Sequence, residues 1–111
     1  MKVAIIGSRG VVKIDIAVHL PAECTEIVSG GARGVDTLAA QYARQKGLLL
    51  TEFLPNYAQF GRGAPLRWNE EIVNYADLVL AFWDGTSRGT AFVINYAKKV
   101  GKPCKVILAN S

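Results

Sequence analysis

The sequence predicts a single α/β domain over residues 1–111, in which a doubly wound sheet of about five mainly parallel strands lies between two layers of helices. Three observations predict this fold class. Short apolar runs alternate along the chain with segments of helical periodicity. The runs are apolar at nearly every position, as in strands buried on both faces of a parallel sheet. A chain of 111 residues, 50% of them hydrophobic, suffices for one core and not for two.

Five apolar runs are predicted to be strands because each is short and bounded by turn residues or by a helix pattern. The first ends at Gly7, the second at a pair of glycines, and the fourth at Asp84-Gly85. In chain order the predicted strands are Lys2–Ile6, Glu26–Ser29, a part of Gly47–Phe53, Leu78–Trp83 and Lys105–Leu108.

Three helices are predicted from the period of their apolar residues and from their ends. The first begins at Val35, has an acid in its first turn and two cations in its last, and stops at Gly47. The second, Pro65–Tyr75, has proline at its first position. The third is Ala91–Lys99, which two lysines and the following Gly101 close.

The segment Val11–Leu20 is ambiguous. Its apolar residues from Ile14 to Leu20 alternate as in a strand, yet the place between two parallel strands requires a crossover. We therefore expect a short helix there.

Composition limits the classes of protein to which the chain can belong. The longest apolar run, Leu78–Trp83, is far shorter than the roughly 20 residues of a membrane span. No signal-peptide pattern precedes the first strand, so we expect no membrane partner and a cytoplasmic location. Cys24 and Cys104 lack a C-x-x-C spacing and are expected to be reduced structural residues. The net charge of +4 favours an anionic partner without specifying nucleic acid.

Metal and triad chemistry lack support in the sequence. No cluster of cysteines, histidines and acids has the spacing of a metal site, so no metal ligand is assigned. His19 is the one histidine of the sequence, and it is expected to lie away from the glycine-containing turns, which argues against a Ser–His–Asp arrangement.

Three predicted strands lead into glycine-containing turns, and in a parallel sheet such turns share one edge. Unpaired N–H groups at helix starts, hydroxyls and arginines would together form a cradle for a phosphate or phosphoribosyl group there. The candidate binding residues of these turns are Gly7, Ser8, Arg9, Ser29, Gly30, Gly31, Arg33, Gly34, Asp36, Asp84, Gly85, Thr86, Ser87, Gly89 and Thr90. Neither G-x-G-x-x-G nor the P-loop pattern occurs, which excludes a P-loop nucleoside triphosphatase. Asp36 is interpreted as a helix cap, as an acceptor for a ribose hydroxyl, or as both.

Two further candidates lie on the predicted helix Pro65–Tyr75. Asn69 interrupts its inward apolar stripe, and its amide would bond either the glycine turns or a ligand. Arg67 near the helix start is unfavourable for the helix dipole, a penalty that a bound phosphate would reverse. The alternative for Arg67 is a surface ion pair with Glu71.

Two strings of residues resemble the SLOG superfamily, the grouping of Smf/DprA and LOG proteins, and most of all its small stand-alone cpYpsA-related branch. They are Gly7-Ser8-Arg9 and the run from Val28 to Asp36, and weaker matches lie at Pro65–Asn69, Ala76-Asp77 and Gly85–Thr90. The resemblance implies a Rossmann-like fold that binds nucleotides or nucleotide derivatives at these turns.

The resemblance also bears on catalysis. LOG proteins hydrolyse the N-glycosidic bond of cytokinin-like nucleoside monophosphates, and their glycine turn reads P-G-G-x-G-T-x-x-E. In this chain Val93 occupies the place of that glutamate, and Arg67 is a candidate for the family's arginine. No residue is therefore assigned as catalytic.

The sequence thus predicts a module that binds a nucleotide-derived ligand, ADP-ribose-like or a nucleoside phosphate, as a sensor or a ligand-processing unit that requires no cofactor. One alternative is a nucleotide N-glycosidic or phosphoester hydrolase, in which Glu70 or Asp84 would have to reach the ligand. Another is single-stranded nucleic-acid binding through basic and aromatic residues. A homo-oligomer is expected by analogy with other small α/β domains.

Overall fold

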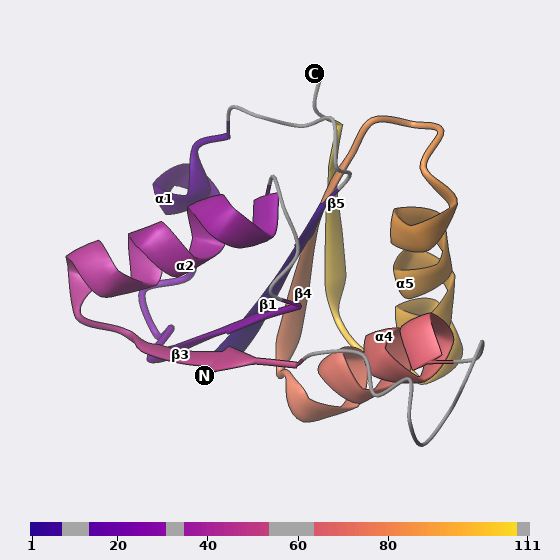
Figure 1. The fold of residues 1–111 in the computed structure, drawn as a ribbon, viewed down its shortest axis with the longest axis horizontal. Coiled ribbons are helices and arrows are strands. Elements are labelled where there is room, and N and C mark those ends of the chain that lie inside the picture. Colours follow the sequence, from indigo (N-terminus) through magenta and orange to yellow (C-terminus); the bar gives the residue numbers. More distant parts are fainter. Residues whose placement is uncertain (8–13, 31–34, 54–63, 109–111) are drawn as a thin grey trace.

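The computed structural model describes residues 1–7, 14–30, 35–53 and 64–108, apart from the side chains of residues 36 and 64–68. These residues form a five-stranded, all-parallel sheet with helices on both faces, so the predicted doubly wound α/β fold is confirmed (Figure 1). The elements in chain order are β1 (Lys2–Gly7), α1 (Ile16–His19), β2 (Glu26–Ser29), α2 (Val35–Lys46), β3 (Leu49–Glu52), α4 (Ala64–Tyr75), β4 (Leu78–Trp83), α5 (Arg88–Lys99) and β5 (Cys104–Leu108).

The strand order is β3-β2-β1-β4-β5. From β1 the chain builds outward through β2 to β3, and it then returns to the other side of β1 to add β4 and β5. The direction of building therefore reverses between β1 and β4, which pair with Gly7 opposite Phe82. The fold is Rossmann-like, and this reversal is its topological switch point.

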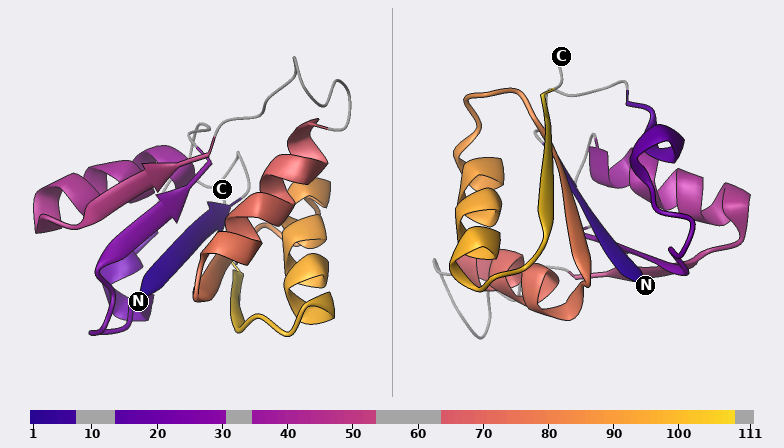
Figure 2. Two further views of the ribbon diagram at one scale, coloured as in Figure 1. Left: turned by 90° about the horizontal axis from the view of Figure 1, so that it is seen from below. Right: turned by 180° about the vertical axis from the view of Figure 1, so that it is seen from behind.

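The side chains of the central strands alternate between two cores, one on each face of the sheet. Val3 and Ile5 of β1 face α1 and α2, while Ala4 and Ile6 face α4 and α5 (Figure 2). Residues 3–5 are completely buried, which explains the unbroken apolar run in the sequence.

The two outer strands depart from the expected burial on both faces. Leu49 of β3 is 67% exposed, and Leu108 of β5 is 75% exposed. The reason is their position, since each pairs with one neighbouring strand of the described sheet and the helices pack mainly over its centre.

The ambiguous segment contains the helix α1, as expected, although residues 11–13 lie outside the described part. The N–H of Leu20 donates to the carbonyl of Ile16 at 3.0 Å. The alternation of apolar residues in the sequence is not an alternation of burial. Ile14, Ile16 and Leu20 contact the core, whereas Val18 is 71% exposed.

Both cysteines are free thiols, one in each half of the structure. Cys24 belongs to the core beneath α1 and α2, and Cys104 packs against the other core. Burial raises the pKa of both thiols, which favours their protonated form near neutral pH. Within the described residues, no helix is long and apolar enough to cross a membrane.

The end of β1 packs closely against the start of α2. A Cβ atom built on Gly7 would lie 2.3 Å from Cγ2 and 2.5 Å from Cβ of Val35, which is itself completely buried. Only glycine permits this approach, so the first turn of α2 lies directly against the end of the central strand.

We predict that Gly7→Ala destabilises the protein by about 1–3 kcal/mol, because the added methyl group must displace α2 or β1. Urea unfolding followed by circular dichroism measures the loss. Gly89→Ala is the matched control, since a Cβ built there meets nothing within 4 Å. A Gly7→Ala variant as stable as the Gly89→Ala variant would contradict the packing role of Gly7.

Candidate functional site

The candidate site is the edge of the sheet at which β1, β2 and β4 end, which we call the carboxyl edge. These three strands are parallel neighbours, so their final residues Gly7, Ser29 and Trp83 lie along one edge. In Figure 1, β4 runs upward into its turn at this edge before the chain descends as α5. Because crossover helices run antiparallel to the strands, the first turns of α2, α4 and α5 also lie toward it.

Several predicted site residues cannot be placed. Ser8, Arg9, Gly31, Arg33 and Gly34 lie outside the described residues. Their part in a phosphate cradle stays a prediction.

Two other candidates are placed by their backbone alone. Asp36 is the second residue of α2, and Arg67 is the fourth residue of α4. Both therefore lie in first turns directed to the carboxyl edge, as the sequence predicted, but their side chains are not described.

The end of β2 is buried. Ser29 is completely buried, its carbonyl accepts the N–H of Phe53 at 2.8 Å, and Gly30 beside it is buried as well. Gly7 ends the neighbouring strand, and the packing of Val35 accounts for its lack of a side chain. These residues form the floor of the carboxyl edge.

The turn between β4 and α5 is organised by a carboxylate. Oδ1 of Asp84 accepts the N–H of Thr86 at 2.9 Å, the hydroxyl of Thr86 at 3.2 Å and the N–H of Ser87 at 2.8 Å. Gly85 has φ +89°, a conformation that favours glycine. The indole N–H of Trp83 donates to the carbonyl of Ser87 at 3.0 Å and closes the turn from the strand side.

This geometry changes the interpretation of three predicted ligand contacts. The sequence suggested that Thr86 and Ser87 would offer donors to a phosphate, but those donors are directed at Asp84. Asp84, Thr86 and Ser87 therefore shape the start of α5.

The first turn of α5 follows directly. The N–H of Ala91 makes the first helical hydrogen bond to the carbonyl of Ser87 at 3.2 Å, so the N–H groups of Arg88 and Gly89 precede the helical bonding pattern. Gly89 has an ordinary negative φ and open space where a Cβ would stand. Thr90 is 3% exposed and interacts with another group of the protein, so it lies on the core side of the helix.

The predicted inward face of α4 is correct in its second half, because Ile72, Val73 and the following Ala76 are completely buried. Asn69, in the middle of the helix, is half-buried. Val93 of α5 is completely buried against the same core. The position that holds a glutamate in the LOG turn is therefore a packing position here.

The expected location of His19 is wrong. Its ring lies 5.7 Å from the ring of Phe82 in an edge-to-face contact, and Phe82 pairs with Gly7. His19 thus packs over the switch-point strands, and its buried Nδ1 has no hydrogen-bond partner among the described residues. Sequence reasoning missed this because the contact joins residues 63 positions apart in the chain and leaves no local signal.

The protein belongs to the class of Rossmann-like α/β domains. Its switch point lies beside the turn between β4 and α5 and the first turn of α5. In a comparison with curated proteins, the chain is 39% identical over 83 residues to the gene 61 protein of Mycobacterium phage D29. The match covers 69% of this chain and 66% of the phage protein, so the chain spans slightly less than two thirds of that relative. No family model matches the chain, and no solved structure matches it significantly.

We predict that Asp84→Ala destabilises the protein by about 1 kcal/mol, because two N–H groups at the start of α5 lose their acceptor. Thermal and urea unfolding measure the loss. Asp84→Asn is the control, because its amide oxygen accepts the same hydrogen bonds and most of the stability should remain. Equal losses in both variants would show that the charge, rather than the hydrogen bonds, supports the turn.

Proposed function

We propose that this protein binds a nucleotide or nucleotide-derived ligand, ADP-ribose-like or a nucleoside phosphate, at the carboxyl edge between β1 and β4. The anionic group would lie at the first turn of α5, and the residues that follow β1 and β2 would hold the rest of the ligand. The proposal describes a binding module, a sensor or ligand-processing unit, without a required cofactor.

The observation that carries the proposal is Gly89. A glycine in a helix costs about 0.5–1 kcal/mol relative to alanine, and neither φ nor packing requires one at this position. Its absent side chain leaves the N–H groups of the first turn accessible from outside, beside the switch point where ligands of doubly wound folds bind. A closely approaching anion supplies a reason for the glycine.

The resemblance to the SLOG superfamily supports the same ligand class, and we propose membership of its cpYpsA-related branch on that ground. Arg9, Arg33 and Arg67 would add positive charge, and Asn69 would close the site from α4. The hydrolase alternative has less support, because the position of the LOG glutamate holds the buried Val93. The printed name of the phage relative states no activity, so it favours neither alternative.

We predict that AMP, ADP or ADP-ribose raises the melting temperature of the protein, whereas adenosine, which lacks phosphate, gives a smaller shift. A ligand at about 100 times its dissociation constant adds about 2.7 kcal/mol of stability. Gly89→Glu should abolish the shift, because a side chain and a negative charge then occupy the anion position. The free variant should be as stable as the wild type, since an acid in the first turn favours the helix.

Asn95→Glu is the matched control. It makes the same charge change on the same helix at an exposed position two turns away, and it should keep the nucleotide shift. The absence of a shift with every nucleotide, or an equal shift in Gly89→Glu, would contradict the proposal. Mass spectrometry of AMP after incubation separates a binding module, which returns AMP unchanged, from a hydrolase, which releases the base or phosphate.

A further inference from the structure

Strand β5 presents an outer edge that no described strand pairs with. It is the last strand in the order β3-β2-β1-β4-β5, and its register with β4 runs from Cys104 opposite Val79 to Leu108 opposite Trp83. The right-hand view of Figure 2 looks toward this strand from the side remote from α2. Val106 is 41% exposed and Leu108 is 75% exposed.

The direction of the backbone groups follows from one hydrogen bond. The N–H of Val79 donates to the carbonyl of Pro103 at 3.0 Å. In a parallel ladder, alternate residues bond to the same neighbour, so Lys105 and Ile107 direct their N–H and C=O groups to β4. The N–H and C=O groups of Cys104, Val106 and Leu108 therefore point to the outer edge.

Natural edge strands are protected against pairing by short length, by charged side chains such as lysine, by proline or by bulges. Within β5 the residues are Cys104, Lys105, Val106, Ile107 and Leu108, so its outward-directed positions carry one cysteine and two aliphatic side chains. One lysine is the only charge in the strand. Lys105 is therefore the one protecting charge of the strand, and Val106 and Leu108 leave apolar surface exposed beside the outward backbone groups.

The charge of the surrounding segment indicates what covers it. Residues 85–111 contain five lysines and arginines and no acid, whereas residues 1–84 contain eight cations and nine acids. The exposed Lys98 lies close enough to Cys104 to lower the pKa of its thiol, against the larger effect of burial, and so flanks β5 on the α5 face. Lys105 is exposed on the opposite face of the sheet.

We propose that the outer edge of β5 binds an extended segment of a partner protein in which acidic and aliphatic residues alternate, and which pairs with β5 as an added strand. Its backbone would bond Cys104, Val106 and Leu108, and its aliphatic side chains would cover Val106 and Leu108 on the α5 face. Its acids would then lie on the opposite face and meet Lys105, while Lys98 adds long-range attraction. A second copy of this chain fits less well, because pairing β5 with itself would bring two segments without acids together, each with five cations.

A single-stranded nucleic acid matches the positive charge of this segment, but it does not match the aliphatic surface of β5. Phe92 and Tyr96 lie parallel at 6.2 Å with 12° between their planes, and the hydroxyl of Tyr96 donates to Asn74, so these rings are engaged with each other and with α4. Val106 and Leu108 offer no aromatic face for a base. The aliphatic side chains favour a peptide.

Amide hydrogen exchange tests the proposal with a decapeptide that alternates glutamate and valine as the probe. At millimolar peptide, the amides of Val106 and Leu108 should become protected, while those of Lys105 and Ile107 are protected before the peptide is added. A decapeptide that alternates lysine and valine should give no protection. Nonspecific adsorption of the peptide would not protect Val106 and Leu108 selectively in this way.

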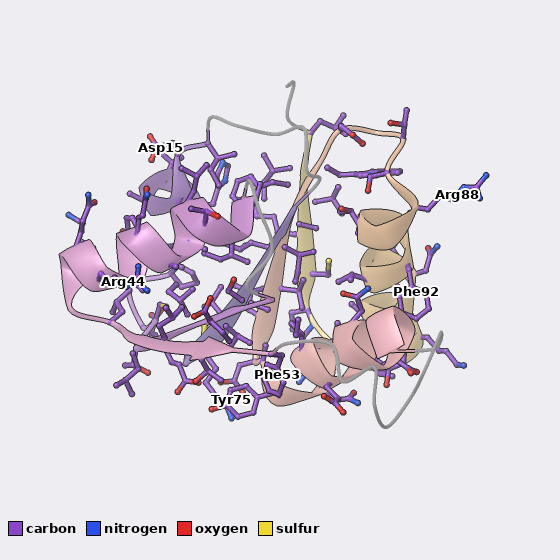
Figure 3. All side chains as sticks on the ribbon, viewed as in Figure 1. Asp15, Arg44, Phe53, Tyr75, Arg88 and Phe92 are labelled. Carbon is purple, nitrogen blue, oxygen red and sulfur yellow. The ribbon has the colours of Figure 1, made fainter. Side chains whose placement is uncertain are left out.

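Two variants locate the contact. Val106→Pro removes an outward N–H without removing a hydrogen bond to β4, and it should abolish peptide binding while the circular dichroism spectrum stays unchanged. Lys98→Glu with Lys105→Glu should weaken binding about tenfold. Arg44→Glu with Lys46→Glu is the control, because it makes the same charge change on α2, on the far side of the sheet from Arg88 in Figure 3. It should change the affinity for the peptide less than about twofold.

Three results would overturn the proposal. The first is the absence of peptide-dependent protection at Val106 and Leu108. The second is protection of these amides without peptide, together with a dimer in sedimentation, which would assign the edge to a second copy. The third is that the wild-type protein binds oligothymidylate and not the peptide, and that the Lys98→Glu/Lys105→Glu variant loses the oligothymidylate binding. Nucleotide binding at the carboxyl edge is measured independently, so either proposal can fail alone.

Discussion

Strand β1 is hydrogen-bonded along both edges and buried on both faces, and the rest of the molecule is arranged by that burial. β2 and β4 pair with it in parallel, and the two cores are built on its alternate side chains. Each fully buried valine or isoleucine contributes about 1.5–3 kcal/mol. The reversal of strand order beside β1 then follows, because β1 is the first strand of the chain and neighbours are added on both of its sides.

The same strand determines how the carboxyl edge is built. Gly7 lets the first turn of α2 approach the end of β1, and β4 ends beside it in a turn whose N–H groups are held by Asp84. The start of α5 is therefore fixed by contacts within the protein. For the nucleotide that we propose, such preorganisation would reduce the entropy lost on binding.

Charge is distributed unevenly over the fold. The acids lie in residues 1–84, and the last helix and strand carry cations alone. Within that basic segment, Lys102 donates to the carbonyl of Ala76 at the end of α4, so one of its cations has a structural role. The exposed cations Lys98 and Lys105 lie beside and within the edge strand β5, so the partner that we propose would be attracted at long range and paired through its backbone at one place.

The elements and their order could be predicted from the sequence, because apolar period, helix ends and glycine turns are local properties. Val35 starts α2 and Tyr75 ends α4, as the periodicity predicted, and the ends of β1, β2 and β4 share an edge as parallel strands require. The described strand ends Gly7, Ser29 and Trp83 are neighbours, but the hydrogen bonds and packing of individual residues there were not evident from residue type.

The amino-acid sequence by itself determined which segments form strands and helices and that the sheet is parallel, since both follow from short-range patterns of hydrophobicity. The tertiary structure alone decided that Val35 requires Gly7, that Asp84 takes the donors of Thr86 and Ser87, that His19 packs on Phe82, and that β5 is left at the edge. Each of these depends on contacts between segments whose distance in space no local pattern encodes, because packing selects among arrangements that the same periodicity allows.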